Sequence, residues 1–457
     1  MPLIDLLHAA RRYYDAGNTR TYSFRKEQLQ KFKKSVLRHE KDLHDALQSD
    51  LKKSPEESWV TETGFLISEI NNAISNLRKW MRPKRVGTNL MNLPASSFVI
   101  KEPLGVVLVI GTWNYPVQLL LNPVVGAIAA GNCVVVKPSE AASATEQVIG
   151  KIIQETFPPE YVLYVSGNGS EVVPEMMNNF RFDHVFYTGS TTVGRLIYKM
   201  AADKLVPVTL ELGGKSPCLV ESDANIKVAA RRIAITKFSN AGQMCIAPDY
   251  VLVHSSKKDE LIQNMKAALR SFFGDDPLVS YNYGKIINEK QFERLMSYMQ
   301  QGEILYGGRH DVEKLFIEPT IMEPSGLDVP LMNEEIFGPI LPIVSFNTTD
   351  EAKAIIRLHP NPLSFYVFTS DSAKEKAWIE QVPFGGGCVN NAAWHFTNHN
   401  LPFGGRGDSG IGRYHGKHTF DTFSHHKSIM KTPTWFDPDL KYPPFKGKLS
   451  LFKKIVR

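Results

Sequence analysis

Cys245 is the first residue of this 457-residue sequence whose type and setting suggest chemistry. It lies in the segment Asn240–Asp249, where Gly242 permits a tight turn and Pro248 ends any helix. A cysteine on a constrained turn can present a thiolate to a cleft as a nucleophile. A lone cysteine is more often a small buried hydrophobic residue, so this segment alone leaves both interpretations open.

A carboxylate and an amide stand out in two other segments. Glu211 ends an apolar run and is followed by two glycines, which let the chain turn away. At the carboxyl end of a parallel strand it would face the ligand crevice and could act as a general base toward water. Asn114, before Tyr115 and Pro116, can donate its amide to a developing oxyanion, worth about 3–4 kcal/mol of transition-state stabilisation. A surface ion pair and a structural turn are the alternatives.

Two segments are candidates for binding a phosphate. Tyr187–Gly194 follows an apolar run and is predicted to open a helix capped by Ser190, with free amides that can meet an anion. It is not a Walker loop, because Arg195 stands where that motif requires lysine. Gly167–Gly169 resembles the start of a G-x-G-x-x-G signature, but position 172 is valine. A plain capped helix start explains the first segment equally well.

Further polar groups follow other apolar runs. Lys137 and Glu140 can hold ribose hydroxyls, and the lysine can also meet a phosphate. Glu335, within Glu334–Pro339, places a carboxylate beside the ring of Phe337. A salt-bridged surface turn is the alternative for either group.

Short apolar strands that alternate with helices separate these segments, which is the pattern of an α/β protein with open parallel sheets. One series is predicted from residue 104 to about 212, and a second from about 213 to 418. The predicted strands are Phe98–Ile100, Val106–Ile110, Cys133–Lys137, Tyr161–Val165, His184–Tyr187, Thr209–Leu212, Cys218–Val220, Tyr250–His254, Ile340–Phe346, Ser364–Thr369 and Gly387–Asn390.

Apolar residues at helical spacing predict helices within Tyr22–Leu51, Phe65–Trp80, Val117–Ala130 and Asn225–Ser239. Another is expected to begin at Ser143, with a capping box to the carboxylate three residues on. Residues 103–136 carry no charge over a length that could cross a bilayer. Their prolines, asparagines and glycines favour a buried strand, loop, helix and strand instead.

The composition is that of a soluble globular protein of two or three domains, with 43% hydrophobic and 22% charged residues. The net charge of +6 is small, and basic residues such as Lys53 have acids nearby, here Glu56 and Glu57, so no nucleic-acid partner is expected. Four scattered cysteines give neither a disulfide framework nor a metal-site spacing. No signal peptide is recognised, and a cytoplasmic location is expected.

The C-terminal segment Lys441–Arg457 has six basic residues and no acid, interleaved with apolar ones. Such a segment can lie on an anionic membrane surface. A solvated or self-packed terminus is the favoured interpretation.

Taken together and in this order, the motifs resemble those of the aldehyde dehydrogenase superfamily over nearly the whole chain. Tyr115, the context Cys245–Tyr250 and the ending Lys441–Phe445 are similar to its class 3 branch, which includes enzymes for fatty and aromatic aldehydes. The matching stretches are W-N-Y-P at 113–116, K-P-S-E at 137–140, T-G-S-T-x-x-G at 188–194, E-L-G-G-K-S-P at 211–217, G-Q-x-C at 242–245, E-E-I-F-G-P at 334–339 and P-F-G-G at 402–405.

The resemblance implies an NAD(P)-dependent oxidation of a medium- or long-chain aliphatic or an aromatic aldehyde to the acid. Cys245 would form a thiohemiacetal and then a thioester, the amide of Asn114 would hold the oxyanion, and Glu211 would activate the hydrolytic water. The negative charge of Glu140 favours NAD, although class 3 enzymes also accept NADP. The residues implied in cofactor binding are Lys137, Glu140, Gly189, Ser190, Val193, Leu212, Glu335 and Phe337.

The same likeness implies a Rossmann-like cofactor domain, an α/β catalytic domain and a small β oligomerisation element that supports a homodimer. An exposed strand edge gives a physical reason for pairing between chains. The expected parts are residues 1–81 with 103–211 for the cofactor domain, 212–418 for the catalytic domain, 82–102 with 419–440 for oligomerisation, and 441–457 for the basic tail.

Three other functions were compatible with parts of the sequence. An acylating dehydrogenase would pass the acyl group of the thioester to coenzyme A, but such relatives commonly lack a carboxylate at the position of Glu211. A non-catalytic protein that kept the fold is disfavoured because every proposed catalytic group is present. A cysteine hydrolase would need a histidine base, for which no motif is recognised. His395 and His399 are instead expected to line the substrate mouth.

Overall fold

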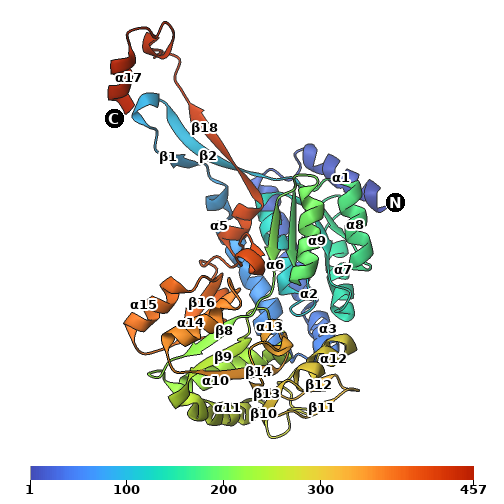
Figure 1. Ribbon diagram of the computed structural model, residues 1–457. Coiled ribbons are helices and arrows are strands. Elements are labelled where there is room, and N and C mark those ends of the chain that lie inside the picture. The colour runs from blue at the N-terminus through green and yellow to red at the C-terminus, as the bar shows by residue number, and fades with distance from the viewer. Residues whose placement is uncertain (1, 457) are drawn as a thin grey trace.

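Two large sheets and one small sheet organise residues 2–456, the part of the chain that the computed structural model describes (Figure 1). The first large sheet has six strands, of which all but the edge strand β17 run parallel. In spatial order they are β17 (Gly410–Ile411), β7 (Val208–Glu211), β6 (His184–Thr188), β3 (Val106–Ile110), β4 (Cys133–Lys137) and β5 (Val162–Tyr164).

The strands of this sheet form because they are short, apolar and covered on both faces. Every residue of β3 and β4 is buried, as expected for a parallel sheet between helices. Ile110 pairs with both Lys137 and Tyr187, and Thr188 pairs with Glu211. The carboxyl ends of β4, β3, β6 and β7 therefore meet at one edge of the sheet, where ligands bind in such folds.

Eight helices surround the first sheet. The segment without charged residues folds as β3, a wholly buried α6 and β4, as predicted. No helix within residues 2–456 has the length and apolar character needed to cross a membrane. The helices are α1 (Leu3–Asp15), α2 (Tyr22–Arg38), α3 (Glu40–Leu51), α5 (Gly64–Met81), α6 (Gln118–Ala130), α7 (Ser143–Thr156), α8 (Gly169–Asn179) and α9 (Thr191–Ala202).

The second large sheet has seven strands, with only β10 antiparallel to its neighbour. In order they are β10 (Gly302–Tyr306), β13 (Thr320–Pro324), β14 (Ile340–Phe346), β9 (Tyr250–His254), β8 (Pro217–Val220), β15 (Ser364–Phe368) and β16 (Gly386–Val389). Its helices are α10 (Ile226–Phe238), α11 (Lys258–Phe273), α12 (Glu289–Tyr298), α13 (Pro330–Asn333), α14 (Thr349–Arg357) and α15 (Ser372–Gln381), and β11 (His310–Asp311) pairs with β12 (Phe316–Ile317) nearby.

The small antiparallel sheet projects from the rest of the molecule as an arm (Figure 1). It contains β1 (Lys84–Val86), β2 (Ser96–Pro103) and β18 (Ser424–Lys431), and β18 follows the short helix α16 (Lys417–Thr422). The expected pairing of the two distant segments is present, with Ser424 opposite Pro103. The tail ends in α17 (Leu449–Val456), drawn near the tip of the arm.

Two predictions need correction. Gly410 and Ile411 fall in the range assigned to the catalytic domain, but as β17 they pair with β7 and extend the first sheet. The helix α7 does begin at Ser143, but no side chain of its own caps it. Asp50 of α3 instead accepts hydrogen bonds from the amides of residues 144 and 145 at 3.2 and 2.8 Å. The remaining domain boundaries stay a prediction.

Candidate active site

Cys245 lies on the tight turn that connects α10 with β9. The segment η3 (Ser239–Gly242) leaves the helix, and Asn240 and Ala241 within it both have φ of 50°. Gly242 has φ of 74°, and a Cβ atom there would lie 2.2 Å from the carbonyl oxygen of Gly338. Only glycine fits this close approach. The turn thus packs against the segment that contains Glu335 and Phe337.

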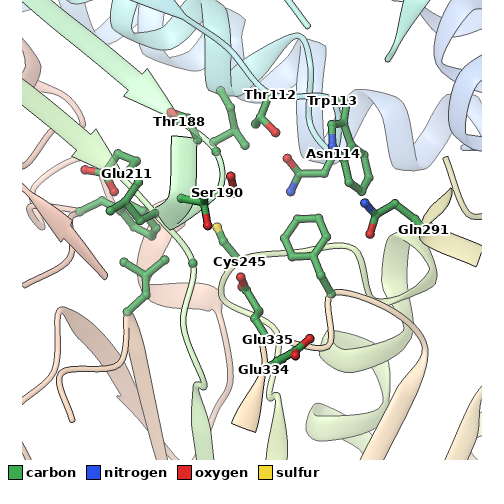
Figure 2. A pocket seen from close by; sticks show the side chains of 18 of the residues that line it. Thr112, Trp113, Asn114, Thr188, Ser190, Glu211, Cys245, Gln291, Glu334 and Glu335 are labelled. Atoms are coloured by element: carbon green, nitrogen blue, oxygen red, sulfur yellow. The ribbon is translucent and has the colours of Figure 1, made fainter. Parts of the chain in front are cut away.

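Two cavities meet at Cys245. The first has a volume of about 440 Å³ and the second about 640 Å³. Four residues border both: Leu119, Cys245, Phe403 and Tyr414. Most of the predicted site residues line the first cavity together with Cys245 (Figure 2): Asn114, Gly189, Ser190, Glu211, Leu212, Glu335 and Phe337.

Of the four free cysteines, only Cys245 borders the two cavities. Cys133 and Cys218 are buried, whereas Cys245 and Cys388 are half-buried. Burial raises the pKa of the Cys245 thiol, and the charges of Glu335 and then Glu211 raise it further. The resting group is therefore a neutral thiol, and a thiolate forms there when a positive charge enters the cavity or a base removes the proton.

Glu211 is a buried carboxyl group at the end of β7. Its side chain borders the first cavity, and neither carboxyl oxygen has a hydrogen-bond partner within residues 2–456. Burial raises the pKa of Glu211 well above its ordinary value. Glu211 and Cys245 both raise the pKa of Tyr414, after burial, so the three groups share one electrostatic environment. A carboxyl group with a raised pKa in a cavity is suited to proton transfer.

Asn114 lies on the loop between β3 and α6, and its side chain reaches the turn of the nucleophile. Its Nδ2 atom donates to the carbonyl oxygen of Gln243 at 3.1 Å. Asn114 is 2% exposed and borders the first cavity. The amide has a second N–H, which is a donor for an oxygen that develops charge beside Cys245.

The N-terminus of α9 opens toward the first cavity and fits a phosphate group. Ser190 caps the helix by accepting from the amide of Val193 at 3.4 Å, and Gly189, Ser190 and Thr192 line the cavity. A Cβ on Gly189 would lie 2.3 Å from the hydroxyl of Tyr187, so a larger residue at this position would have to displace that side chain. Free amides at such an N-terminus attract anions. Val193 is not itself among the lining residues.

The other phosphate candidate, Gly167–Gly169, forms a hydrogen bond with Glu140. The amide of Gly169 donates to Glu140 Oε1 at 3.0 Å, and Glu140 Oε2 pairs with Lys137 Nζ at 3.0 Å. Partial burial raises the pKa of Glu140, but these hydrogen bonds and the lysine outweigh it and leave the pKa lowered. Lys137 and Glu140 are not among the residues that line the first cavity, and their contact with a cofactor stays a prediction.

Glu335 and Phe337 line the first cavity from the segment that packs against the turn of Cys245. A Cβ on Gly213 would lie 1.8 Å from Glu335 Oε2, so this carboxyl group rests directly on the backbone beside Leu212. Burial raises the pKa of Glu335 to about 8, with Asp249 adding to the effect. Phe337, with φ of 48°, packs edge-to-face on Trp113 at 5.3 Å.

The second cavity is mainly apolar. Aromatic rings from three parts of the chain border it and, although polar residues such as Glu56 and Glu57 also line it, most of its exposed surface is apolar. Its aromatic lining residues are Tyr115, Phe272, Phe273, Trp394, Phe396, Phe403 and Tyr414. An apolar cavity that ends at a nucleophile suits a substrate with a hydrocarbon body.

The prediction that His395 and His399 line the substrate mouth is wrong for this cavity. The short helix η5 (Trp394–Thr397) turns Trp394 and Phe396 toward the cavity, while His395 stacks on Phe403 at 5.8 Å. His399 pairs with a carboxylate oxygen of Glu69 at 2.8 Å.

Sequence reasoning missed three side chains of the site. Tyr414 and Phe403 border both cavities, and Arg294 lines the first. Arg294 donates to the carbonyl oxygens of Glu335 and Ile336 at 3.2 and 2.8 Å, so it holds the loop that presents Glu335. Phe403 lies in the P-F-G-G motif and could have been singled out, but no local pattern marks Arg294 or Tyr414.

Comparison with known proteins agrees with this arrangement. The model of the aldehyde dehydrogenase family matches residues 4–429. The 4,4'-diaponeurosporen-aldehyde dehydrogenase of Staphylococcus aureus is 44% identical, with 97% of each chain covered. A dimeric, NADP-preferring aldehyde dehydrogenase of Canis lupus familiaris is 40% identical, with 98% of each chain covered. Further relatives whose names place them in family 3 are 39–43% identical over at least 97% of this chain.

The fold is also that of a solved structure. The substrate-bound state of Staphylococcus aureus AldH superposes with a TM-score of 0.97 at 43% sequence identity, and the match covers 100% of both chains.

Proposed function

The chain belongs to the aldehyde dehydrogenase family, and from this membership we propose that it oxidises apolar aldehydes to carboxylic acids through a thioester on Cys245. NAD(P)-dependent oxidation of an aldehyde is the activity of the family. One observation supports the proposal above all. Cys245 borders both the cavity that holds Asn114, Ser190 and Glu211 and the apolar cavity on its other side.

In the first step, the Cys245 thiol releases its proton, the one released in the overall reaction, and the sulfur of the thiolate bonds to the aldehyde carbon. The C=O double bond opens and the carbonyl oxygen becomes an oxyanion. The side-chain amide of Asn114 and the backbone amide of Cys245 stabilise that charge, which lowers the free energy of the thiohemiacetal. The apolar cavity holds the remainder of the aldehyde and keeps water away from the reacting carbon.

A nicotinamide cofactor, when bound, would supply the acceptor for the hydride of the thiohemiacetal carbon. Ser190, Gly189 and the N-terminus of α9 would hold its pyrophosphate, and Leu212, Glu335 and Phe337 would surround its nicotinamide end. Glu211 then takes a proton from water, which attacks the thioester, breaks the C–S bond and restores the thiol. The balance is aldehyde, oxidised cofactor and water giving acid, reduced cofactor and one proton.

For the cofactor, we propose that NAD is preferred and NADP accepted. Glu140 keeps its negative charge through the amide of Gly169 and the ammonium of Lys137. If Glu140 contacts the adenosine ribose, that charge repels a 2′-phosphate. The relative from dog is named NADP-preferring, so the two cofactors need a direct comparison.

We further propose a homodimer in the cytoplasm. The arm formed by β1, β2 and β18 has an exposed strand, β18, at its edge, which can pair with a second chain. The dog relative is named as dimeric. Sedimentation of the protein, with and without strand-breaking prolines in β18, tests this assembly.

A coupled assay distinguishes this function from acyl transfer to coenzyme A. The purified protein, given NAD and decanal without coenzyme A, should form NADH and decanoic acid in equal amounts, and Cys245→Ala should form neither. A strict requirement for coenzyme A would refute the hydrolytic function.

A further inference from the structure

A buried ion pair lies behind the loop that carries Asn114. Lys53 Nζ and Glu62 Oε1 are 2.7 Å apart, and both side chains are 0% exposed. Glu62 belongs to η1 (Trp59–Thr63), a π-helical turn that follows α4 (Pro55–Ser58). Such turns are frequent at functional sites. Neither charged side chain lines either cavity, so the pair acts on the site only through other residues.

The ion pair fixes both ends of the loop from Asn114 to the start of α6. Glu62 Oε2 accepts from the amides of Val117 and Gln118 at 3.1 and 3.0 Å. Lys53 Nζ donates to the backbone carbonyl oxygen of Asn114 at 3.0 Å and lies 3.8 Å from the centre of the Tyr115 ring.

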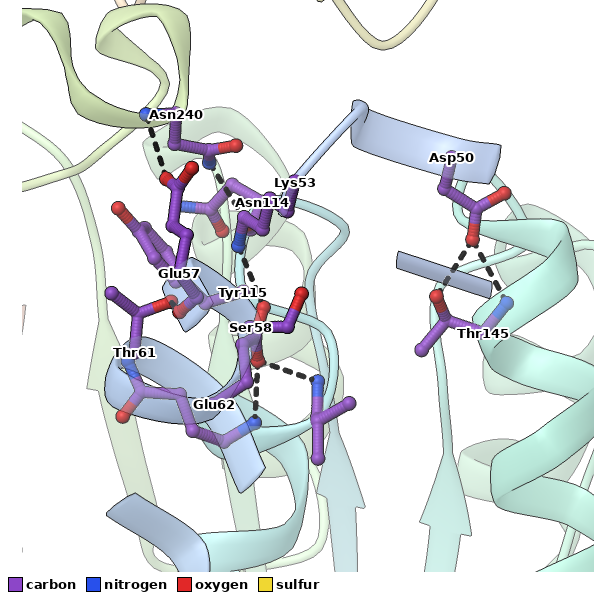
Figure 3. Close-up of polar contacts among 12 residues, drawn as sticks. Asp50, Lys53, Glu57, Ser58, Thr61, Glu62, Asn114, Tyr115, Thr145 and Asn240 are labelled. Atoms are coloured by element: carbon purple, nitrogen blue, oxygen red, sulfur yellow. Dashed lines mark hydrogen bonds and ion pairs between the residues drawn. The ribbon is translucent and has the colours of Figure 1, made fainter. Parts of the chain in front are cut away.

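A second donor reaches the same carbonyl oxygen from the turn of the nucleophile. Asn240 Nδ2 donates to the carbonyl oxygen of Asn114 at 2.9 Å and to that of Gln243 at 3.1 Å. Figure 3 shows Lys53, Glu62, Asn114 and Asn240 in one group. The carbonyl of Asn114 is thus held between an ammonium group and an amide that come from distant parts of the chain.

The backbone of Asn240 is held by a further carboxylate. Glu57 Oε1 accepts from the amide of Asn240 at 3.2 Å (Figure 3). Asn240 adopts the left-handed conformation, which asparagine tolerates better than most residues, and the adjacent Ala241 adopts it at a steric cost. Strained backbone of this kind persists only where its surroundings enforce it.

We propose that Lys53 and Asn240 are positioning residues that fix the carbonyl of Asn114 and thereby aim its side-chain amide at the oxyanion. The inference rests on the oxyanion role given to Asn114 above. A buried ion pair is seldom more stable than apolar residues of the same size, so stability alone does not explain the pair. An oxyanion donor acts only within about 2.7–3.1 Å of the charge, so a small shift of the Asn114 backbone removes its effect.

Two variants and one matched control test the proposal. Lys53→Met combined with Glu62→Gln removes both charges of the ion pair together. Asn240→Gly removes the second donor at a position whose left-handed backbone conformation glycine also adopts readily. Ala241→Gly is the control, because Ala241 has the same φ of 50° and no side-chain hydrogen bond.

The decisive quantity is the rate constant of the first NADH turnover at saturating decanal, measured by stopped flow. The double variant and Asn240→Gly should each lower it tenfold or more, and Ala241→Gly should stay within twofold of the unmodified protein. The dissociation constant of NADH and the rate of Cys245 alkylation by iodoacetamide should stay within twofold in all of them. A merely structural role would instead lower the number of active sites and leave this rate constant unchanged.

If the first NADH turnover of Asn240→Gly has the same rate constant as that of Ala241→Gly, the positioning role of Asn240 is wrong. This outcome can be read whether or not the double variant folds. Asn114→Ala separates this failure from that of the proposed function. If Asn114→Ala slows the first turnover and Asn240→Gly does not, only the positioning role is wrong. If Asn114→Ala has no effect, the oxyanion role itself is wrong.

Discussion

The side-chain amide of Asn114 donates a hydrogen bond to the carbonyl oxygen of Gln243 at 3.1 Å, two residues before Cys245. This contact joins the loop after β3 of the first sheet to the turn before β9 of the second. The contact therefore fixes the position of the Asn114 amide, the candidate oxyanion donor, relative to the Cys245 thiol. The chemistry proposed here depends on that relative position.

Replacing Glu211 with glutamine should separate the two halves of the reaction. The variant lacks a base for water but keeps the volume and polarity of the side chain, so acylation should continue. We expect a burst of NADH that approaches one per site, followed by a steady state slower by about 10²–10⁴-fold. Stopped-flow absorbance measures both phases. A variant that loses the burst together with the steady state would show that Glu211 acts before hydrolysis.

The pH dependence of thioester hydrolysis should report the same carboxyl group. Burial raises the pKa of Glu211, and only its ionised form accepts a proton from water. Hydrolysis should therefore be fast above the raised pKa and be lost as the pH falls through it. The steady-state rate of the unmodified protein should fall on the acid side at a pH well above that of an ordinary glutamate. The residual rate of Glu211→Gln should lack this acid limb.

Chain length should govern substrate preference. Each methylene buried in the apolar cavity contributes about 0.8 kcal/mol, or roughly a fourfold increase in kcat/KM. We expect kcat/KM to rise from butanal to decanal and then to level off when the cavity of about 640 Å³ is filled. Trp394→Ala should flatten the upper part of this series, because Trp394 borders the cavity. A flat series in the unmodified protein would contradict the assignment of this cavity.

Removal of the charge at Glu140 should shift the choice of cofactor. In Glu140→Gln the repulsion of a 2′-phosphate is lost, and we expect the ratio of kcat/KM for NADP to that for NAD to rise by about three- to tenfold. Glu146→Gln, one turn into the next helix, serves as the control and should leave the ratio unchanged. Equal ratios in both variants would place Glu140 away from the adenosine ribose.

The sequence predicts much of this site because strands with strong local signals flank its residues. Val106–Ile110, Cys133–Lys137 and Tyr250–His254 are apolar and β-branched, and the structure has strands with the same bounds. In a parallel sheet, residues that follow such strands gather at one edge. The positions of Asn114 and Glu211 at one edge of the first sheet therefore follow from the order of the strands. Cys245 precedes β9 of the second sheet, so only its motif marks it as a site residue.

What the sequence does not predict depends on contacts between distant residues. Glu56 and Glu57 lie close to Lys53 in sequence, but its partner is the buried Glu62, inside a π-helical turn that has no recognised pattern. Asp50 caps a helix that begins 93 residues later, where a local capping box was expected. Pairings of this kind become visible only when the fold brings the two elements together.

The most direct test of the thioester is to trap it. The Glu211→Gln protein should be mixed with NAD and decanal and quenched with acid during the NADH burst. The protein is then digested, and the masses of its peptides are measured by mass spectrometry. The account predicts a decanoyl group on the peptide that contains Cys245, in proportion to the NADH formed. NADH formed without an acyl group there, or with the acyl group on another residue, would contradict it.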